Sequence, residues 1–236
     1  MAERQDAELT RSKGERTRDR IRLVTVELLN EVGYRDLKVA EICERAAISP
    51  PVLYLYFENK EALTADVLQE FLDRFLTREP EGDGATPYEA ILSANQRWIA
   101  LARENAGLMR CLLQFSEEVP AFARIFRRAS HLWYERIARS VIRRYPTAAA
   151  EEPAIQLIAH ALGGLVDEVT RKLFADPDPH VRKLAATVAP GDTQLAHMLS
   201  VIWHRALYGC DATASDGASL PLAPRLAAAR QRERRR

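Results

Sequence analysis

Residues 33–63 read GYRDLKVAEICERAAISPPVLYLYFENKEAL, and this stretch decides the fold of the N-terminal part of the chain. Its first half predicts a helix with one buried stripe, because four apolar residues recur at i, i+3, i+4 and i+7: Val39, Ile42, Cys43 and Ala46. A break with two prolines follows, and a second, very short helix is predicted over 52–57. Two helices joined by a short turn form the helix-turn-helix motif, whose second helix enters the major groove of DNA.

Further helices are predicted on both sides of this motif. Upstream, apolar residues at helical spacing predict a helix with Thr17 as its N-cap and with Gly33 as a left-handed residue at its end. Downstream, Asn59 is the predicted N-cap of a fourth helix, which has an apolar face from Leu63 to Phe75.

The stretch resembles the N-terminal signature of the TetR/AcrR transcriptional regulators over about fifty residues. The matching pieces are Gly33-Tyr34, Val39 with Ile42, Ile48-Ser49, Leu53-Tyr54, Tyr56-Phe57 and Lys60-Glu61-x-Leu63. Three departures stand out: the family usually has Thr or Ser where this chain has Leu37 and Lys38, Gly where it has Ala47, and often Gly or Ala where it has Pro51. Because proline disfavours the α conformation of the residue before it, the short helix is expected to begin a residue late.

The resemblance implies that Tyr54, Tyr56 and Lys60 contact DNA phosphates. A lysine in the first turn of a helix adds charge beside free N–H groups, which suits an anion; the alternative for Tyr56 is a core aromatic. The residues expected on the DNA side are Lys38, Ser49, Pro50, Pro51, Tyr54, Leu55, Tyr56 and Lys60. This surface is largely apolar, so it can pack on thymine methyl groups but offers few hydrogen bonds, and DNA shape is expected to contribute to specificity.

Charge and composition bound the rest of the chain. The net charge is only +1 over 236 residues, which excludes a generally basic protein, but basic residues gather near both ends. We predict a flexible basic arm at 1–15, a helix-turn-helix DNA-binding domain at 16–60, a ligand-binding and dimerisation domain at 61–209, and a disordered, Arg-rich tail at 210–236. Basic residues at 11–22 can reach phosphates or a minor groove, or form a solvated tail. The three scattered cysteines, the lack of a signal sequence and the lack of a long apolar run favour a cytoplasmic protein with no membrane span.

The body is predicted to be entirely helical, because helical periodicity fills the chain and no long alternating pattern appears. Two of its predicted helices have broad apolar faces. One covers 155–174, and the other begins at its cap Asp192 and ends at about Tyr208. They resemble the pair that forms the four-helix dimer interface in the TetR family; the alternative is an internal core. The expected interface residues are Ile158, Leu162, Val166, Leu195, Leu199 and Ile202.

An effector cavity is expected among the helices at 87–102, 106–115 and 120–145, where the family has its inducer site. The expected lining is Trp98, Met109, Phe115, Phe122, Phe126 and Trp133. Each of these residues could equally be core, but sites between bundle helices are common. The helix at 120–145 carries seven arginines and only one glutamate. This excess of positive charge suits either an anionic ligand, such as a fatty acid or acyl thioester, or a solvated basic face.

The sequence has no zinc-type Cys–His spacing, HExxH, Glu-x-x-His pair, GxxxxGK or GxGxxG, so we expect no cofactor and no enzymatic activity. We therefore expect an all-α, homodimeric regulator that binds a near-palindromic operator as a repressor and is released by a small hydrophobic effector. The effector would shift the fourth helix and change the spacing of the reading helices, which must lie about 34–36 Å apart. The alternatives are a DNA-binding dimer without an effector and, disfavoured by the absent motifs, a helical-bundle enzyme.

Overall fold

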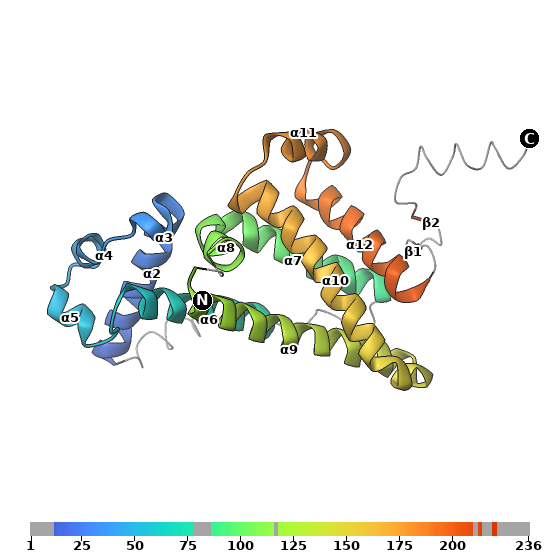
Figure 1. Ribbon diagram of the computed structural model, residues 1–236, viewed down its shortest axis with the longest axis horizontal. Helices are drawn as coiled ribbons and strands as arrows, with labels where there is room; N and C mark the ends of the chain where they lie inside the picture. Colours follow the sequence, from blue (N-terminus) through green and yellow to red (C-terminus); the bar gives the residue numbers. More distant parts are fainter. Residues whose placement is uncertain (1–11, 78–85, 116–117, 210–211, 214–218, 221–236) are drawn as a thin grey trace, which may run out of the picture. The chain divides into compact units, whose positions relative to one another are not determined.

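The computed structural model describes residues 12–77, 86–115, 118–209, 212–213 and 219–220, and it is helical almost throughout (Figure 1). The α-helices are α2 (Lys13–Glu31), α3 (Gly33–Asp36), α4 (Val39–Arg45), α5 (Pro50–Tyr54), α6 (Lys60–Thr77), α7 (Pro87–Glu104), α8 (Ala106–Leu113), α9 (Pro120–Arg144), α10 (Glu152–Thr170), α11 (Pro179–Val188) and α12 (Asp192–Tyr208). A 3-10 helix (Pro146–Glu151) precedes α10 and a π-helical turn (Arg171–Ala175) follows it, while β1 (Ala212–Thr213) pairs antiparallel with β2 (Ser219–Leu220). The all-α prediction is confirmed. Within the described residues, no helix is both long and apolar enough to cross a membrane.

The chain packs as two compact units. Unit 1 comprises the described residues up to Thr77 together with Asn105–Ala129, and unit 2 comprises those of 78–104 and 130–236. The division falls inside α9, so this helix contributes its first part to unit 1 and its second part to unit 2. The predicted tail at 210–236, apart from β1 and β2, and residues 1–11 of the predicted arm lie outside the described residues.

Unit 1 is built on α2, which packs against α4, α6 and α8. Its core includes Ile21, Leu28, Ile42, Leu53 and Leu63, all fully buried. These side chains come from the helix-turn-helix and from the two helices predicted on either side of it. The periodicity of residues 17–68 therefore predicted most of the buried faces correctly, but Val39 is only half-buried and Val32, expected on the buried face of the first helix, is 38% exposed.

The start of α2 differs from the prediction. Ser12, not Thr17, is the N-cap: Glu15 N donates to its hydroxyl at 3.2 Å, and Ser12 N donates to the Glu15 carboxylate at 2.7 Å, which completes a capping box. Thr17 lies one turn inside the helix, where its hydroxyl donates to the Lys13 carbonyl. The expected arm is consequently helical from Lys13 onward.

Two other helix starts also differ. Helix α5 begins at Pro50 rather than a residue late, because a proline already has a helical φ and needs no hydrogen-bonded N–H in the first turn; the helix ends at Tyr54, short of the predicted Phe57. In unit 2, the N-cap of α12 is Gly191, and the predicted cap Asp192 instead accepts hydrogen bonds from the Arg103 guanidinium. Asn59 does cap α6, since Ala62 N donates to its side-chain oxygen at 2.8 Å.

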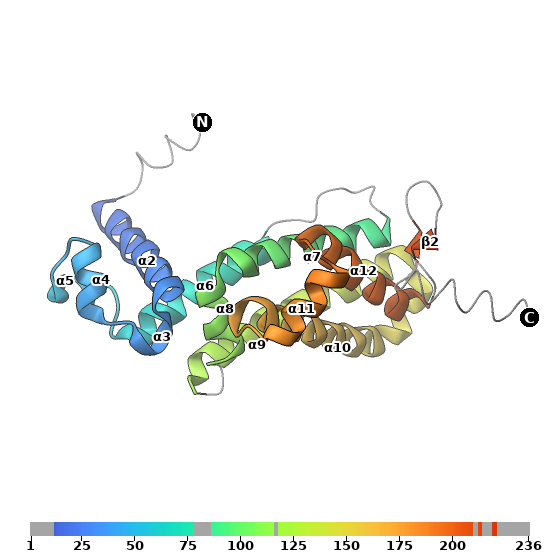
Figure 2. The ribbon, with the colours of Figure 1, turned by 90° about the horizontal axis from the view of Figure 1, so that it is seen from above.

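Unit 2 is organised around α7 and α12, which lie side by side (Figure 2). Polar contacts join them: the buried Asn95 Nδ2 donates to the buried Ser200 Oγ at 2.9 Å, and the Tyr88 hydroxyl lies 2.5 Å from Nδ1 of the half-buried His197. Burial of these groups with partners fixes the register of the two helices, because a buried polar group without a partner is costly.

Candidate DNA-contacting surface and effector pocket

The turn between α4 and α5 is a Schellman motif. Ile48 N donates to the Cys43 carbonyl at 3.0 Å and Ala47 N donates to the Glu44 carbonyl at 3.1 Å, with Ala47 in the left-handed region at φ 49°. Ala47 thus occupies a left-handed turn position, where the resemblance led us to expect glycine. This turn sets the angle at which α5 leaves α4.

The exposed face of α5 coincides with the expected DNA-contacting residues. Tyr54 is 53% exposed and Leu55 81%, and both follow a buried Leu53 that anchors the helix. Ser49, Pro50, Pro51 and Lys38 are also exposed. An 81% exposed leucine has no role in the core of unit 1, which leaves it available to a partner surface.

The other two expected phosphate contacts are partly engaged within unit 1. Tyr56 is half-buried, with its hydroxyl beside Gly14 in the first turn of α2. The Lys60 ammonium donates to the Tyr34 carbonyl at 3.0 Å and lies over the Tyr34 ring. Lys60 therefore binds carbonyl groups of α3, an interaction that the sequence analysis missed because α3 itself was not predicted.

Two of the basic residues at 11–22 are likewise engaged within unit 1. Arg22 Nε lies 2.6 Å from Asp66 and its Nη1 lies 2.8 Å from Glu70, while Arg18 Nη2 lies 2.8 Å from Asp66. These ion pairs join α2 to α6. Arg18 and Arg22 are thus held by carboxylates within unit 1, whereas Arg16 and Arg20 are exposed on α2.

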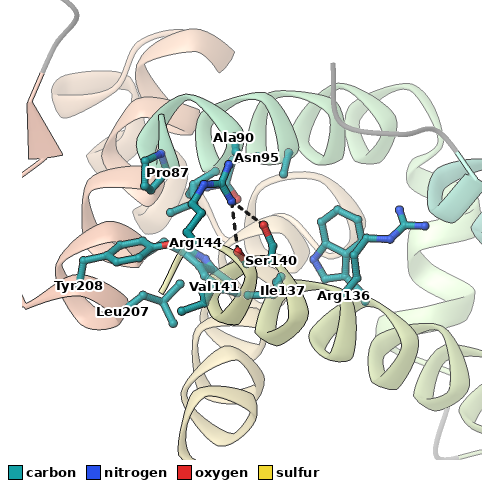
Figure 3. A pocket seen from close by; sticks show the side chains of 14 residues that line it. Pro87, Ala90, Asn95, Arg136, Ile137, Ser140, Val141, Arg144, Leu207 and Tyr208 are labelled. Carbon is teal, nitrogen blue, oxygen red and sulfur yellow. Dashed lines mark hydrogen bonds between the residues drawn. The ribbon is translucent and has the colours of Figure 1, made fainter. Parts of the chain in front are cut away.

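A partly enclosed pocket of about 100 Å³ lies in unit 2 (Figure 3). Its lining comes from three helices: Pro87, Ala90, Ile91, Ala94 and Asn95 of α7; Trp133, Arg136, Ile137, Ser140, Val141 and Arg144 of α9; and Trp203, Leu207 and Tyr208 of α12. Most of this lining is apolar, which suits an organic ligand.

Of the six residues expected to line an effector cavity, Trp133 lines this pocket. Met109, Phe115 and Phe122 are buried in unit 1, where the Tyr34 ring meets Phe122 edge-on at 5.0 Å and lies 6.0 Å from Phe115. Phe126 also belongs to unit 1, and Trp98 is buried on α7 in unit 2.

The polar lining of the pocket was missed from sequence. Arg136, Ser140 and Arg144 recur every four residues on α9, directly beside the apolar series Trp133, Ile137 and Val141. The four-residue spacing places the three polar residues next to the buried apolar stripe of α9, not on the opposite side of the helix. This spacing could have been read from the sequence. Burial raises the pKa of the Tyr208 hydroxyl at one end of the pocket, against the opposing effect of the Arg144 charge.

The expected dimer residues divide into two groups. Leu162, Val166, Leu195 and Leu199 are buried inside unit 2, whereas Ile158 is 37% exposed and Ile202 is half-buried. The exposed apolar stripe of α10 is one step round the helix from the predicted one: Ala154, Leu157, Ile158 and Ala161, at i, i+3, i+4 and i+7.

Comparison with known proteins gives one family match. The family described as bacterial regulatory proteins, tetR family, matches residues 21–67, which contain α4 and α5. The uncharacterized HTH-type transcriptional regulator YdgC of Bacillus subtilis (strain 168) is 36% identical over 64 residues, 27% of this chain and 33% of YdgC. The match thus spans about a third of the length of this curated relative.

Solved structures extend the likeness to most of the chain at low identity. A transcriptional regulator from Rhodococcus sp. Rha1 has a TM-score of 0.64 at 22% identity, covering 84% of this chain and 99% of that one. The transcriptional regulator FadR from Bacillus subtilis, solved in complex with stearoyl-CoA, has a TM-score of 0.59 at 17% identity, covering 81% of this chain and 98% of that one. At these identities the likeness shows a shared fold.

Proposed function

We propose that this chain, whose residues 21–67 belong to the tetR family of bacterial regulatory proteins, is a cytoplasmic transcriptional repressor that binds a near-palindromic operator as a homodimer. The observation that carries this proposal is the exposed face of α5. Tyr54, at the end of the second helix of a helix-turn-helix, and Leu55, directly after it, are exposed, whereas the neighbouring Leu53 and Phe57 are buried. TetR-family regulators bind DNA, and this surface is where the motif reads the major groove.

The chemistry of the α5 surface predicts how it reads DNA. From Ser49 to Tyr56 the chain carries no charged side chain, so direct hydrogen bonds to base edges are few. Leu55 and the two prolines suit thymine methyl groups, and Lys38 and Arg16 supply charge for phosphates. The operator is therefore expected to have A·T pairs at the positions that α5 faces.

Binding to a selected operator tests this function. Genomic fragments bound by the full chain are sequenced, and the resulting site is titrated by fluorescence anisotropy with Leu55→Ala and with the matched control Leu184→Ala, whose leucine is 52% exposed on α11. Leu55→Ala should weaken binding about five- to tenfold, the effect of roughly 1 kcal/mol of lost apolar contact, and the control should bind as wild type. Fragments without an inverted repeat, or equal affinities of the two variants, would refute the proposal.

We further propose that a small effector in the pocket of unit 2 weakens operator binding. The support is the mostly apolar lining of the pocket and the position of α9, which provides Ile137 and Val141 to the pocket and Phe122 to the core of unit 1. A ligand that displaces α9 therefore acts on an element shared by both units. A coupling of about 1–3 kcal/mol would change DNA affinity 5- to 150-fold.

A further inference from the structure

The pocket of unit 2 combines an apolar wall with a positive charge. Ile91, Ile137, Val141 and Leu207 contribute aliphatic surface, and two arginines, Arg136 and Arg144, are among the lining residues. None of the fourteen residues that line it, within the part of the chain that the structure describes, is acidic. A lining with two arginines and no acidic residue favours an anionic guest over a neutral or cationic one.

Arg144 is oriented within the pocket by a neighbouring side chain. Its Nη1 donates to Ser140 Oγ at 2.6 Å and approaches the Ser140 carbonyl at 3.4 Å, so the guanidinium is held one turn back along α9 (Figure 3). The Arg144 side chain lies between α9 and α7, on the side of Ala90. An arginine held in this way presents its planar donors with little further loss of conformational freedom, which suits a carboxylate.

Arg136 strengthens the positive potential two turns away. Its Nη1 is buried and has no hydrogen-bond partner among the described residues, and its guanidinium lies 5.9 Å from the centre of the Trp133 ring. Since Arg136 and Arg144 are eight residues apart, their backbones are about 12 Å apart along the helix axis. One small anionic group can therefore pair with only one of them, and the Ser140 contact makes Arg144 the better positioned partner.

The volume of the pocket limits the size of the apolar part of the ligand. Its volume of about 100 Å³ is smaller than that of pockets for drug-sized ligands, which run from about 300 Å³. A cavity of roughly 150 Å³ is sufficient for benzene. At about 100 Å³ this pocket is smaller than that cavity, so it suits a short chain or part of a ring, and the rest of the guest would extend through the open side of the pocket.

We infer that this pocket binds a small organic carboxylate, with its apolar ring or short chain against Ile137, Val141 and Ile91 and its carboxylate on Arg144. This inference rests on the proposed function only for the effect of the ligand on DNA. The binding site itself is defined by unit 2 alone.

The test is calorimetric titration of the full-length protein without DNA, with benzoate, its neutral isostere benzamide and the cation benzylammonium as probes. Benzoate should bind about tenfold or more tightly than benzamide, the ratio expected for one hydrogen-bonded charge pair. Arg144→Gln should weaken benzoate to the level of benzamide and leave benzamide unchanged. The matched control Arg143→Gln, at an exposed arginine one position earlier on α9, should bind all three probes as wild type does.

Two further variants keep the test decisive if Arg144→Gln does not fold. Ser140→Ala keeps the charge and removes the hydroxyl that orients it, so it should weaken benzoate several-fold. Ala94→Leu fills the pocket and should abolish binding of benzoate. Equal affinity for benzoate and benzamide, no benzoate binding at millimolar concentration, or unchanged benzoate affinity in Ser140→Ala and Ala94→Leu would each overturn the inference.

An anisotropy assay with operator DNA separates this inference from the proposed function. If benzoate binds through Arg144 but does not weaken DNA binding, the inference stands and the proposed effector mechanism fails. If a neutral compound releases the DNA while benzoate does not bind, the carboxylate site is refuted and the effector mechanism stands.

Discussion

At the scale of single residues, two positions show side chains held under strain or against their ordinary chemistry. Ala47 has a φ of 49°, a region that costs a non-glycine residue roughly 1–2 kcal/mol. Desolvation of the half-buried Asp167 on α10 raises the pKa of its carboxyl to about 7. Both effects therefore lower the stability of the folded chain at neutral pH, and a single substitution can remove each of them.

Replacing Ala47 with glycine should stabilise the protein by about 0.5–1 kcal/mol. The relief of left-handed strain is partly offset by the greater freedom of glycine in the unfolded chain. Urea unfolding should show a higher midpoint with an unchanged slope. The neighbouring control Ala46→Gly should lower the midpoint, because Ala46 is buried and has right-handed angles; a lower midpoint for Ala47→Gly would contradict the prediction.

Asp167→Asn should change how stability depends on pH. Because the folded pKa is raised above the unfolded value of about 3.9, the folded chain holds its proton more tightly, and stability is lost as pH rises from about 4 to about 7. The asparagine variant lacks this loss, so its stability relative to wild type should be greater at pH 8 than at pH 5 in urea titrations. In Glu168→Gln, where Arg171 lowers the wild-type pKa to about 2, the difference from wild type should be the same at pH 6 and pH 8.

At the scale of elements, the end of α2 depends on α8. Gly107 N donates to Asn30 Oδ1 at 2.8 Å, and a Cβ on Gly107 would lie 2.2 Å from the Leu29 carbonyl oxygen. The Arg110 guanidinium also lies near the last carbonyls of α2, with Nη2 3.4 Å from both Leu29 O and Asn30 O. The backbones of α2 and α8 are thus in direct contact, which is why α8 belongs to unit 1.

Gly107→Ala should therefore destabilise unit 1 by at least about 1–3 kcal/mol, since one of the two backbones must move. Gly14→Ala is the matched control in the first turn of α2, where the nearest atom would lie at an ordinary 3.6 Å. This control should be neutral or stabilising by up to about 1 kcal/mol, as expected for alanine in place of glycine in a helix. Equal unfolding midpoints for the two variants would refute the contact.

At the scale of the whole molecule, the exposed stripe on α10 requires a partner under the proposed function. Leu157 is 71% exposed, and it lies between Ala154 and Ala161 on the same face as Ile158. Small residues on both sides let another helix approach closely. A second copy of the chain would cover this stripe, and two helix-turn-helix heads would then contact both halves of a near-palindromic site.

If the proposed dimer forms, Leu157→Glu should convert it to a monomer and weaken operator binding at least about tenfold, because a buried charge without a partner is costly at an interface. Sedimentation velocity at micromolar concentration measures the first effect and anisotropy the second. Leu132→Glu, at a leucine that is 44% exposed on α9, is the matched control and should remain dimeric. A monomeric wild type, or a dimeric Leu157→Glu variant, would exclude this interface.

The sequence by itself determined the helical class, the position of the helix-turn-helix and the capping of α6 by Asn59, because these depend on periodicity and on hydrogen bonds between near neighbours. Ser12 with Glu15, which could also have been found this way, was missed. Only the tertiary structure decided which apolar faces are used. Leu162 and Leu199 are core rather than surface, Phe122 packs under Tyr34, and Arg144 faces a pocket that α7 and α12 complete. The physical reason is that one helix pattern is satisfied equally by burial inside the chain, against a second chain or around a ligand, and only the packing of distant segments distinguishes these cases.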